Sequence, residues 1–373
     1  MTTLKSGLEG VVAASTRLSH VDGERGELLI AGFPVEALAA RATFEEATWL
    51  LWHDSLPTRR ELAEFGAALA ARRTLPNATL ALIAECARTG ADPMDTLRMA
   101  TDSIALEVND APAIVARMPS IVAAYWRLRS GQEPIAPRAD LGHAANYLYM
   151  LNGVEPDVER VRALETYLNT VIDHGLNAST FTCRVITSTG SDLVSAIVGA
   201  IGALKGPLHG GAPGPALETV FEIGDASRAE AVLRQKIEAG DRLMGFGHRV
   251  YKVRDPRADV LAAAAERMFT RGGDMSLYTL ARSVEQTALH LLEEYKPGRR
   301  LQTNVEFYTA LVLHGLGLEV SLFTPTFAIG RASGWIAHAL EQREAGRLIR
   351  PSSEYIGARD RSWVPLEARQ AAA

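Results

Sequence analysis

The sequence predicts an all-α protein, and three observations support this fold class. Apolar residues recur at helical spacing over most of the chain, helix-capping patterns interrupt them, and strands that alternate with helices are missing. The clearest pattern lies between residues 155 and 173, where the apolar positions three or four residues apart are Val158, Val161, Leu164, Leu168 and Val171. One long amphipathic helix is expected there.

Three Ser/Thr-x-x-Glu patterns mark expected helix starts. The pairs are Thr43 with Glu46, Thr58 with Glu61, and Ser227 with Glu230. In such a capping box the two side chains satisfy backbone N–H groups that a helix start leaves free. Pro57, Pro76 and Gly90 should then divide the N-terminal region into successive helices.

A small hairpin is the one convincing β feature of the sequence. Residues 17–21 and 27–30 flank a turn that begins at Asp22-Gly23. The sequence lacks G-x-G-x-x-G after a strand, G-x-x-x-x-G-K-[ST], H-E-x-x-H and G-x-S-x-G. Nucleotide-fold dehydrogenases, P-loop enzymes, zincins and serine hydrolases are therefore disfavoured. A repeat of fixed period is also missing, which argues against a helical solenoid.

Length and composition indicate an ordinary globular protein. A chain of 373 residues predicts two domains, and 47% hydrophobic with 22% charged residues is the balance of a globular chain. The net charge of -5 gives no reason to expect nucleic-acid binding. An anionic ligand must then meet a local cluster of Arg and Lys.

Targeting signals are not recognisable in the sequence. The first residues have neither the pattern of a secretory signal nor that of a transit peptide, and no run of about 18 apolar residues predicts a membrane span. Cys86 and Cys183 are far apart and fall in expected helices, so buried thiols in a reducing compartment are predicted. We therefore expect a cytoplasmic protein without a membrane partner.

Four helix junctions stand out, three with histidine beside glycine and one with a carboxylate among apolar and aromatic residues, and junctions of this kind are where chemistry is expected in a helical protein. They are residues 173–180 with His174, 206–211 with His209, 244–257 with His248, and 303–308 with Glu306. Each histidine taken singly is more simply a helix cap or a surface group, and Glu306 could merely favour the helix dipole. Three histidines in glycine-containing turns favour a functional site.

Two other classes of protein fit the same residues. The three histidines could be the ligands of a catalytic zinc ion. A non-catalytic helical scaffold is the other alternative, although ionisable residues at glycine-containing turns would then have no evident role. Composition and spacing alone reach no further than a helical enzyme with an anionic ligand.

Read in order, the four junctions resemble the citrate synthase family, whose bacterial type includes 2-methylcitrate synthases. Residues 245–257, from Gly-Phe-Gly-His to Asp-Pro-Arg, are similar to the family signature almost residue for residue. Weaker similarity covers essentially the whole chain, at residues 7–11, 92–94, 177–180 and 350–351. The chain departs from the family at Gly175, where many relatives carry an acid, and at Glu306, where most carry Asp.

The resemblance implies a domain organisation and an assembly. A large helical domain would comprise residues 1–211 and 327–373, and a smaller domain of residues 212–326 would close over the substrate. A homodimer is implied, in which each active site borrows a residue from the partner chain. The activity implied is condensation of oxaloacetate with acetyl-coenzyme A, a step of the tricarboxylic acid cycle.

The implied reaction needs a base and a hydrogen-bond donor, because the acetyl methyl group is a very weak acid until its thioester oxygen is stabilised. By resemblance Glu306 is the base, His209 is the donor, and His248 polarises the ketone of oxaloacetate. Guanidinium groups hold carboxylates bidentately. The family pattern assigns the two carboxylates of oxaloacetate to Arg257, Arg331, His174 and, from the partner chain, Arg350.

Coenzyme A is implied as a cosubstrate, with neither a tightly bound cofactor nor a metal. Glycines would let the backbone approach it, and the expected contacts are Leu208, Gly210, Leu243, Gly245 and Gly247. Lys252, with Arg249 and Arg254 nearby, could meet phosphates or form a solvated charge cluster. The nearest rival activity is that of a 2-methylcitrate synthase, because one methylene of propionyl-coenzyme A changes pocket binding by only about 1–3 kcal/mol.

Overall fold

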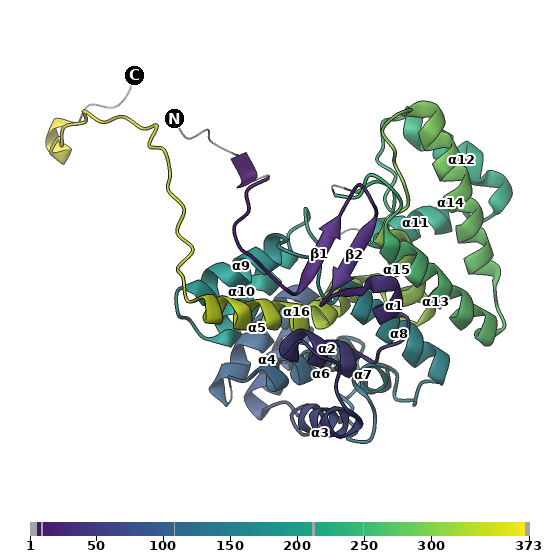
Figure 1. Cartoon of the computed structure of the whole chain (residues 1–373), viewed down its shortest axis with the longest axis horizontal. Helices are drawn as coiled ribbons and strands as arrows, with labels where there is room; N and C mark the ends of the chain where they lie inside the picture. The colour runs from purple at the N-terminus through teal and green to yellow at the C-terminus, as the bar shows by residue number, and fades with distance from the viewer. Residues whose placement is uncertain (1–5, 9, 108, 211–212, 249, 370–373) are drawn as a thin grey trace.

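The computed structural model describes residues 6–8, 10–107, 109–210, 213–248 and 250–369. Among these residues there are sixteen α-helices, several short 3-10 turns and one three-stranded sheet. Figure 1 shows a helical body from which both ends of the described chain extend to the same side. The prediction of an all-α fold is confirmed.

The N-terminal helices follow the predicted punctuation. They are α1 (Val35–Ala39), α2 (Phe44–His53), α3 (Arg59–Ala70), α4 (Asn77–Thr89), α5 (Pro93–Asp102), α6 (Ala111–Arg129) and α7 (His143–Asn152). Thr43 and Thr58 form complete capping boxes at the starts of α2 and α3. Pro76 precedes α4, and Gly90 ends it in the left-handed region at φ 69°.

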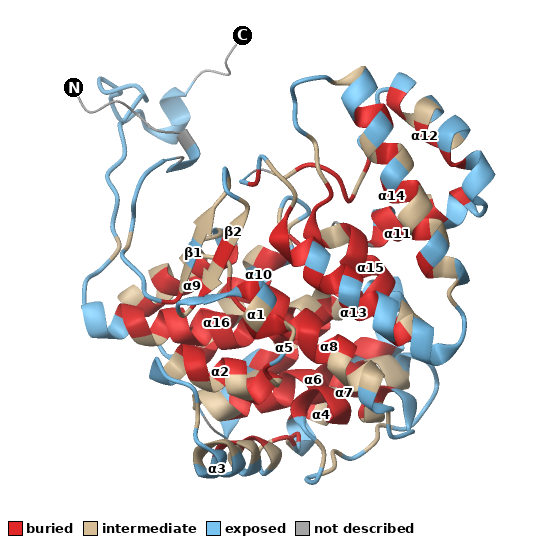
Figure 2. Cartoon of the chain, turned by 45° about the vertical axis from the view of Figure 1, so that its right-hand side comes forward, coloured by how far each residue is buried: buried red, intermediate tan, exposed pale blue. Residues whose placement is uncertain are grey.

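Helix α16 (Phe323–Ala345) forms the centre of the body. It contacts α2, α6, α8 (Val158–Val171), α9 (Ala178–Ser188) and α10 (Leu193–Leu204). Figure 2 shows it buried along most of its length. Gly334 allows the closest approach, because an added Cβ would lie 2.1 Å from the Ile172 carbonyl oxygen. The residue preceding Ile172 ends α8, so α16 lies directly against the end of that helix.

The predicted amphipathic helix is α8, which begins at Val158 after Asp157 accepts the backbone N–H groups of Glu159 and Arg160. Leu164, Leu168 and Val171 are buried as expected. Val158 was expected on the apolar face and is instead 72% exposed. The residues that follow it, 159–162, are half-buried, so Val158 lies at the edge of the packed surface.

A second group of helices lies between α10 and α16. It consists of α11 (Pro213–Ile223), α12 (Ala229–Glu238), α13 (Pro256–Gly272), α14 (Ser276–Tyr295) and α15 (Val305–Gly315). Helix α13 packs against both α8 and α15, whereas α12 and α14 pack on each other at the far edge of the molecule (Figure 1). This group therefore meets the central body through α13 and α15.

The capping box predicted at Ser227 is wrong. Its backbone N–H and its hydroxyl both donate to Asp225, which caps a short 3-10 turn at Ala226–Arg228. Helix α12 then begins at Ala229 without a side-chain cap. Asp225 lies two residues before Ser227, and its carboxylate is a stronger acceptor than a hydroxyl. Ser227 therefore donates to Asp225, and its hydroxyl does not accept the backbone N–H of Glu230 as a capping box would require.

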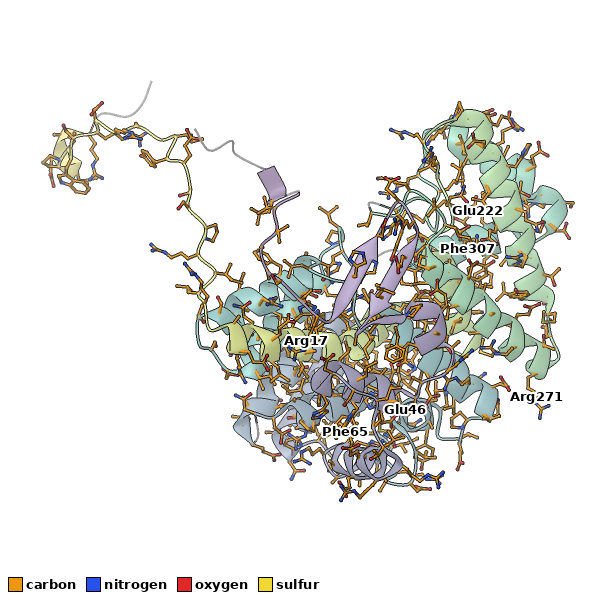
Figure 3. The ribbon with its side chains drawn as sticks, viewed as in Figure 1. Arg17, Glu46, Phe65, Glu222, Arg271 and Phe307 are labelled. Atoms are coloured by element: carbon orange, nitrogen blue, oxygen red, sulfur yellow. The ribbon has the colours of Figure 1, made fainter. Side chains whose placement is uncertain are left out.

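The predicted hairpin is present as β1 (Ser19–Asp22) and β2 (Glu27–Ile30), which pair antiparallel with Asp22 opposite Glu27. A third strand, β3 (Phe33–Pro34), pairs with β2 and was not predicted. Two residues that end in proline carry no period-2 signal. Just before β1, the backbone N–H of Arg17 donates to Glu341 of α16, over which Arg17 lies in Figure 3.

Buried and exposed residues complete this picture. Cys86 and Cys183 are free and buried, as predicted. Residues 350–369 after α16 are exposed, including the large apolar residues Ile356 and Trp363. No single described helix is long and apolar enough to cross a membrane; α15 and the segment Val320–Ala345 pass that test only as a pair bent by 118°.

Replacing Gly334 with alanine should destabilise the fold. The new Cβ would have to displace the Ile172 carbonyl in a fully packed region, which costs about 1–3 kcal/mol of unfolding free energy. Gly66 of α3 is the control, because nothing lies within 4 Å of its added Cβ. Gly66→Ala should stabilise by about 0.5–1 kcal/mol. Equal denaturation midpoints for the two variants would contradict this account of the α8–α16 contact.

Candidate active site

Backbone pairing brings the third and fourth predicted junctions together. The N–H of Gly247 donates to Gln302 O at 2.7 Å, and the N–H of Asn304 donates to Gly245 O at 3.0 Å. The Asn304 side chain donates to Gly247 O at 2.7 Å and accepts from the N–H of Glu306. His248 therefore follows a loop that is bound to the segment preceding Glu306.

His248 is held in one protonation state by the backbone that follows it. Its Nδ1 accepts the N–H groups of Val250 and Tyr251, both at 3.1 Å. A nitrogen that accepts two N–H groups carries no proton, so the ring proton lies on Nε2. Burial, with Arg257 nearby, lowers the pKa of His248 to about 4. The ring is a neutral donor through Nε2.

His174 lies beside His248, and their ring centroids are 5.9 Å apart. Its Nε2 is 3.1 Å from the hydroxyl of Tyr251, a residue of the loop that fixes His248. Burial and the charges of Arg257 and Arg331 lower the pKa of His174 well below its ordinary value. Both histidines are therefore neutral near pH 7.

His209 follows α10 and contacts the start of α9. Its Nε2 lies 2.8 Å from the hydroxyl of Ser179 and 3.4 Å from the N–H of Ser179. A backbone N–H can only donate, whereas the hydroxyl accepts the indole N–H of Trp335 and has one proton, which can go to Nε2 or to Asn177 Oδ1 at 2.8 Å. These contacts place Nε2 against Ser179 and leave Nδ1 as the ring nitrogen that Ser179 does not contact. Burial, with Arg331 nearby, lowers the pKa of His209 to about 4.

Glu306 stands in the first turn of α15 and lines a cavity of about 20 Å³, enough for one water-sized group. Tyr167, Gly210, Arg257 and Phe327 also line it. Burial raises the pKa of Glu306 to about 7, although the positive charge of Arg257 acts in the opposite direction. A carboxyl group with this pKa can both take and return a proton near neutral pH.

The two buried arginines are fixed differently. Arg257 donates through Nε and one terminal nitrogen to the two oxygens of Asp255, at 3.0 and 2.8 Å. The Nε of Arg331 donates to the Val171 carbonyl, and its guanidinium lies 4.7 Å from the ring centroid of Phe327. Burial lowers the pKa of Arg331 to about 10, so this residue stays charged. Each guanidinium is oriented before any ligand arrives.

Arg350 is not brought into this cluster by its own chain. It is exposed in the extended segment after α16, next to Ile349, whose N–H donates to Ser188 at the end of α9. The other six predicted catalytic and oxaloacetate-binding residues line or border the same region: His174, His209, His248, Arg257, Glu306 and Arg331.

A second cavity, of about 470 Å³, opens beside His248. Among the predicted coenzyme A contacts, Leu243 and Gly247 line it. Three cations that the sequence analysis missed also line it: Arg242, Lys296 and Arg299. They belong to no motif; the run of basic residues around Gly298 could have pointed to Lys296 and Arg299, and no signal pointed to Arg242. This cavity combines positive charge with apolar surface next to the histidine.

The remaining predicted coenzyme A contacts lie apart from that cavity. Gly210 lines the small cavity of Glu306. Leu208 is fully exposed, and Gly245 adopts φ 89° against Phe307. Lys252 donates its backbone N–H to Gly23 O.

The signature loop contains two further cations, Arg254 and Arg249. Arg254 is bound to Asp259 at 2.6 Å and to Glu285 at 2.7 Å, so its guanidinium serves the fold. Glu285 also accepts hydrogen bonds from Thr303 and Tyr308, which tie it to the start of α15. Arg249 lies outside the described residues.

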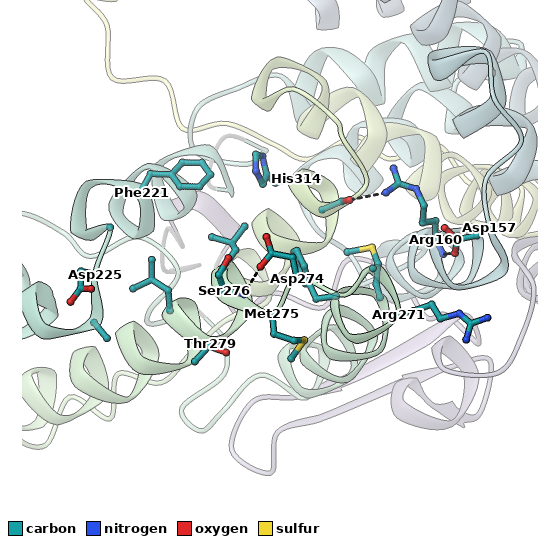
Figure 4. Close-up of a pocket in the computed structure, with 18 residues that line it drawn as sticks. Asp157, Arg160, Phe221, Asp225, Arg271, Asp274, Met275, Ser276, Thr279 and His314 are labelled. Atoms are coloured by element: carbon teal, nitrogen blue, oxygen red, sulfur yellow. Dashed lines mark hydrogen bonds between the residues drawn. The ribbon is translucent and has the colours of Figure 1, made fainter.

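A larger cavity of about 990 Å³ lies elsewhere, between the end of α13 and the start of α14 (Figure 4). Phe221, Met275 and His314 line it, and none of the clustered residues does. Asp274 caps Ser276 there, and Arg160 donates to Gly315 O, so these charged groups already serve helix ends. The chemistry concentrates in the smaller cavities.

The zinc alternative finds no support in the ligand geometry. Within the described residues, the His, Cys, Asp and Glu side chains whose ligand atoms lie within 4.8 Å of one another are His20, Asp22 and Glu27. These belong to the hairpin and are partly exposed. One ring nitrogen of each clustered histidine is already directed elsewhere, to Tyr251, to Ser179 or to the loop backbone.

The helical fold, the neutral histidines, the carboxyl group with a raised pKa and the two buried arginines define a helical acid–base enzyme for an anionic substrate. A family model described as "Citrate synthase, C-terminal domain" matches residues 7–352. The chain belongs to the citrate synthase family.

Individual proteins are similar to this chain over nearly their whole length. The citrate synthase of Haloferax volcanii is 41% identical, over 98% of this chain and 99% of that protein. A 2-methylcitrate synthase of Mycobacterium tuberculosis is 39% identical, over 96% and 92%. The citrate synthase of Thermoplasma acidophilum, solved with carboxymethyl coenzyme A and oxaloacetate, superposes with a TM-score of 0.89 at 31% identity, over 98% and 100%.

The stability of the protein should depend on pH through Glu306. Because its folded pKa of about 7 exceeds the ordinary 4.5, the unfolded chain loses this proton first, and stability falls as the pH rises from 4.5 to 7. Glu306→Gln should therefore unfold like wild type near pH 4 and be more stable by up to about 3 kcal/mol near pH 8. Denaturant titrations measure both. A pH-independent difference would contradict the raised pKa.

Proposed function

We propose that this protein is a citrate synthase, which condenses oxaloacetate with acetyl-coenzyme A and water to give citrate and coenzyme A. The observation that carries this proposal is the position of Glu306. Its pKa of about 7 suits a base, and it shares a cavity with Arg257, one of two buried arginines that suit a dicarboxylate. The neutral histidines His209 and His248 provide the hydrogen-bond donors that the reaction needs.

The first step is removal of a proton from the acetyl methyl group. Glu306 takes this proton, and the electron pair moves into the thioester, so that negative charge develops on its oxygen. His209 donates to that oxygen through Nδ1, the ring nitrogen that Ser179 does not contact. A neutral imidazole suits this task, because its pKa of about 4 keeps it from being protonated at the pH at which Glu306 is a base.

In the second step the methyl carbon forms a bond to the ketone carbon of oxaloacetate. The ketone oxygen becomes an alkoxide, which the Nε2–H of His248 stabilises and protonates, and the proton that Glu306 took from the methyl group then restores the Nε2–H of His248. Water then hydrolyses the thioester, and the acyl–sulfur bond breaks to release coenzyme A. His248 begins each cycle with its proton on Nε2, because the backbone of residues 250 and 251 occupies Nδ1.

The two carboxylates of oxaloacetate would bind Arg331, Arg257 and His174, with Arg350 contributed by a second copy of the chain. In support, Arg350 belongs to an exposed segment that carries the apolar side chains of Ile356 and Trp363. Exposed apolar groups of this size suit a partner surface. A homodimer in which this segment reaches the neighbouring active site is therefore proposed.

Acetyl-coenzyme A would bind in the cavity beside His248, as a cosubstrate and not as a tightly bound cofactor. Arg242, Lys296 and Arg299 are placed to meet its phosphates, and Leu243 and Gly247 would border its chain. Leu208, Gly210, Gly245 and Lys252 remain proposed contacts from the neighbouring loops. The thioester would then reach between His209 and Glu306.

Closure is proposed between a large unit, residues 1–211 and 327–373, and a smaller unit, residues 212–326. In support, Glu306, His248 and Arg257 come from the smaller unit, whereas His174, His209 and Arg331 come from the larger one. Closing would complete the site and exclude water. Oxaloacetate should reduce the radius of gyration in solution scattering.

The cytoplasmic location and the place in the tricarboxylic acid cycle stay predictions.

A 2-methylcitrate synthase activity is the second candidate, because a relative so named is 39% identical to this chain. The deciding experiment measures coenzyme A release with oxaloacetate, using acetyl- and propionyl-coenzyme A in parallel. A higher kcat/KM for acetyl-coenzyme A is expected. A higher kcat/KM for propionyl-coenzyme A would assign the second activity, and no release from either would overturn the family's chemistry for this chain.

Glu306→Gln should lose nearly all turnover while it still binds oxaloacetate, because an amide cannot take the methyl proton. Glu306→Asp should lose on the order of 10²-fold, since the shorter side chain withdraws the carboxylate by about 1 Å. Steady-state turnover and calorimetric titration with oxaloacetate measure the two effects. Ordinary turnover by Glu306→Gln would show that another group takes the proton.

Arg299→Gln should raise the KM for acetyl-coenzyme A about fivefold with little change in kcat, because a phosphate contact binds the ground state and the transition state alike. Arg271→Gln is the matched control. It removes an exposed arginine that lines the unrelated cavity near α13 and α14. An equal KM for the two variants would remove Arg299 from the coenzyme A site.

A further inference from the structure

The turn of the β1–β2 hairpin contacts the loop that carries His248. The backbone N–H of Lys252 donates to Gly23 O at 2.9 Å. The hairpin rises between the α9–α10 side of the molecule and the group of α11 to α15 (Figures 1 and 2). The contact between Gly23 and Lys252 therefore joins segments that are more than 200 residues apart in sequence.

Gly23 is required by this contact and not by its own backbone. An added Cβ would lie 2.2 Å from Val250 O and 2.7 Å from the Val250 carbonyl carbon, far inside contact distance. The φ of Gly23 lies outside the left-handed region, so alanine could adopt its conformation without strain. Only the neighbouring loop excludes a side chain here.

The part of the loop that the hairpin contacts is the part that orients His248. The N–H groups of Val250 and Tyr251 bind Nδ1 of His248, while Val250 O and the Lys252 N–H face Gly23. A shift of this backbone would move the Nε2–H of His248. Gly23 can thus affect the orientation of His248 through the backbone of residues 250–252.

The other end of the hairpin holds His174. The Ser19 hydroxyl of β1 donates to Asp173 Oδ2 at 2.5 Å and accepts the N–H of Gly175 at 2.7 Å. These two bonds fix the chain on both sides of His174. His174 in turn lies 3.1 Å from the Tyr251 hydroxyl. A single hairpin therefore sets the positions of both histidines.

We propose that the β1–β2 hairpin is the latch of the closed active site, with Gly23 and Ser19 as positioning residues. This inference rests on the proposed condensation and domain closure. The Gly23 contact crosses between the two units that closure would join, whereas the Ser19 contacts stay within the larger unit. Gly23 then acts on closure, and Ser19 acts on the orientation of His174 in both states.

The test compares Gly23→Ala with Glu24→Ala, an exposed neighbour in the same turn. To accommodate the Cβ the loop must retreat by about 1 Å, so kcat/KM for oxaloacetate should fall on the order of 10²-fold in Gly23→Ala. Glu24→Ala should match wild type. Without ligand both variants should unfold at the wild-type temperature, because an open form would not make the contact between Gly23 and Val250 that excludes the Cβ.

Ligand-induced stabilisation separates a latch from a general structural role. Saturating oxaloacetate should raise the melting temperature of wild type and of Glu24→Ala, because it binds the folded state. The rise should be much smaller in Gly23→Ala, and scattering should show less compaction. Equal turnover and equal oxaloacetate-induced stabilisation in Gly23→Ala and Glu24→Ala would overturn the latch.

Ser19→Ala provides a second variant that adds no atoms. It should raise the KM for oxaloacetate about tenfold, because the segment around His174 loses the two hydrogen bonds that hold Asp173 and Gly175. A wild-type KM would overturn the role of Ser19. Failure of the proposed function looks different, since wild-type protein itself would then release no coenzyme A in the presence of oxaloacetate.

Discussion

The buried carboxylate of Asp255 is the interaction on which the rest of the site depends. It is fully buried, caps α13, binds two nitrogens of Arg257 and accepts the N–H of Val305 at 3.2 Å. One side chain therefore joins the end of the His248 loop to the start of the Glu306 helix. A buried carboxylate is stable only with such partners. Removing it would leave the buried guanidinium of Arg257 without its bidentate carboxylate partner.

Burial shifts the pKa values of the histidines and of the carboxyl group of this site in opposite directions, and this difference gives them separate roles. The same loss of solvent that lowers the pKa values of His209 and His248 to about 4 raises that of Glu306 to about 7. The two arginines reinforce the first effect and oppose the second. Near neutral pH the histidines are donors without charge, and the carboxylate is the group that titrates.

Sequence patterns predicted elements whose signals are local. The capping boxes at Thr43 and Thr58 were found where both partners lie within one turn, and the hairpin was found from its turn residues. The prediction failed at Ser227 because a nearer aspartate competed for the same donors. The strand β3 and the cations around the 470 Å³ cavity were missed, since neither has a periodic or motif signal.

The sequence by itself determined the helical class, the family resemblance and the identity of the candidate chemical groups, because capping, periodicity and the signature stretch are properties of neighbouring residues. Only the tertiary structure decided how those groups work. Which nitrogen of His248 carries the proton depends on two backbone N–H groups, and the pKa of Glu306 depends on burial by helices distant in sequence. Hydrogen bonding and desolvation act through space, so no pattern along the chain could fix them.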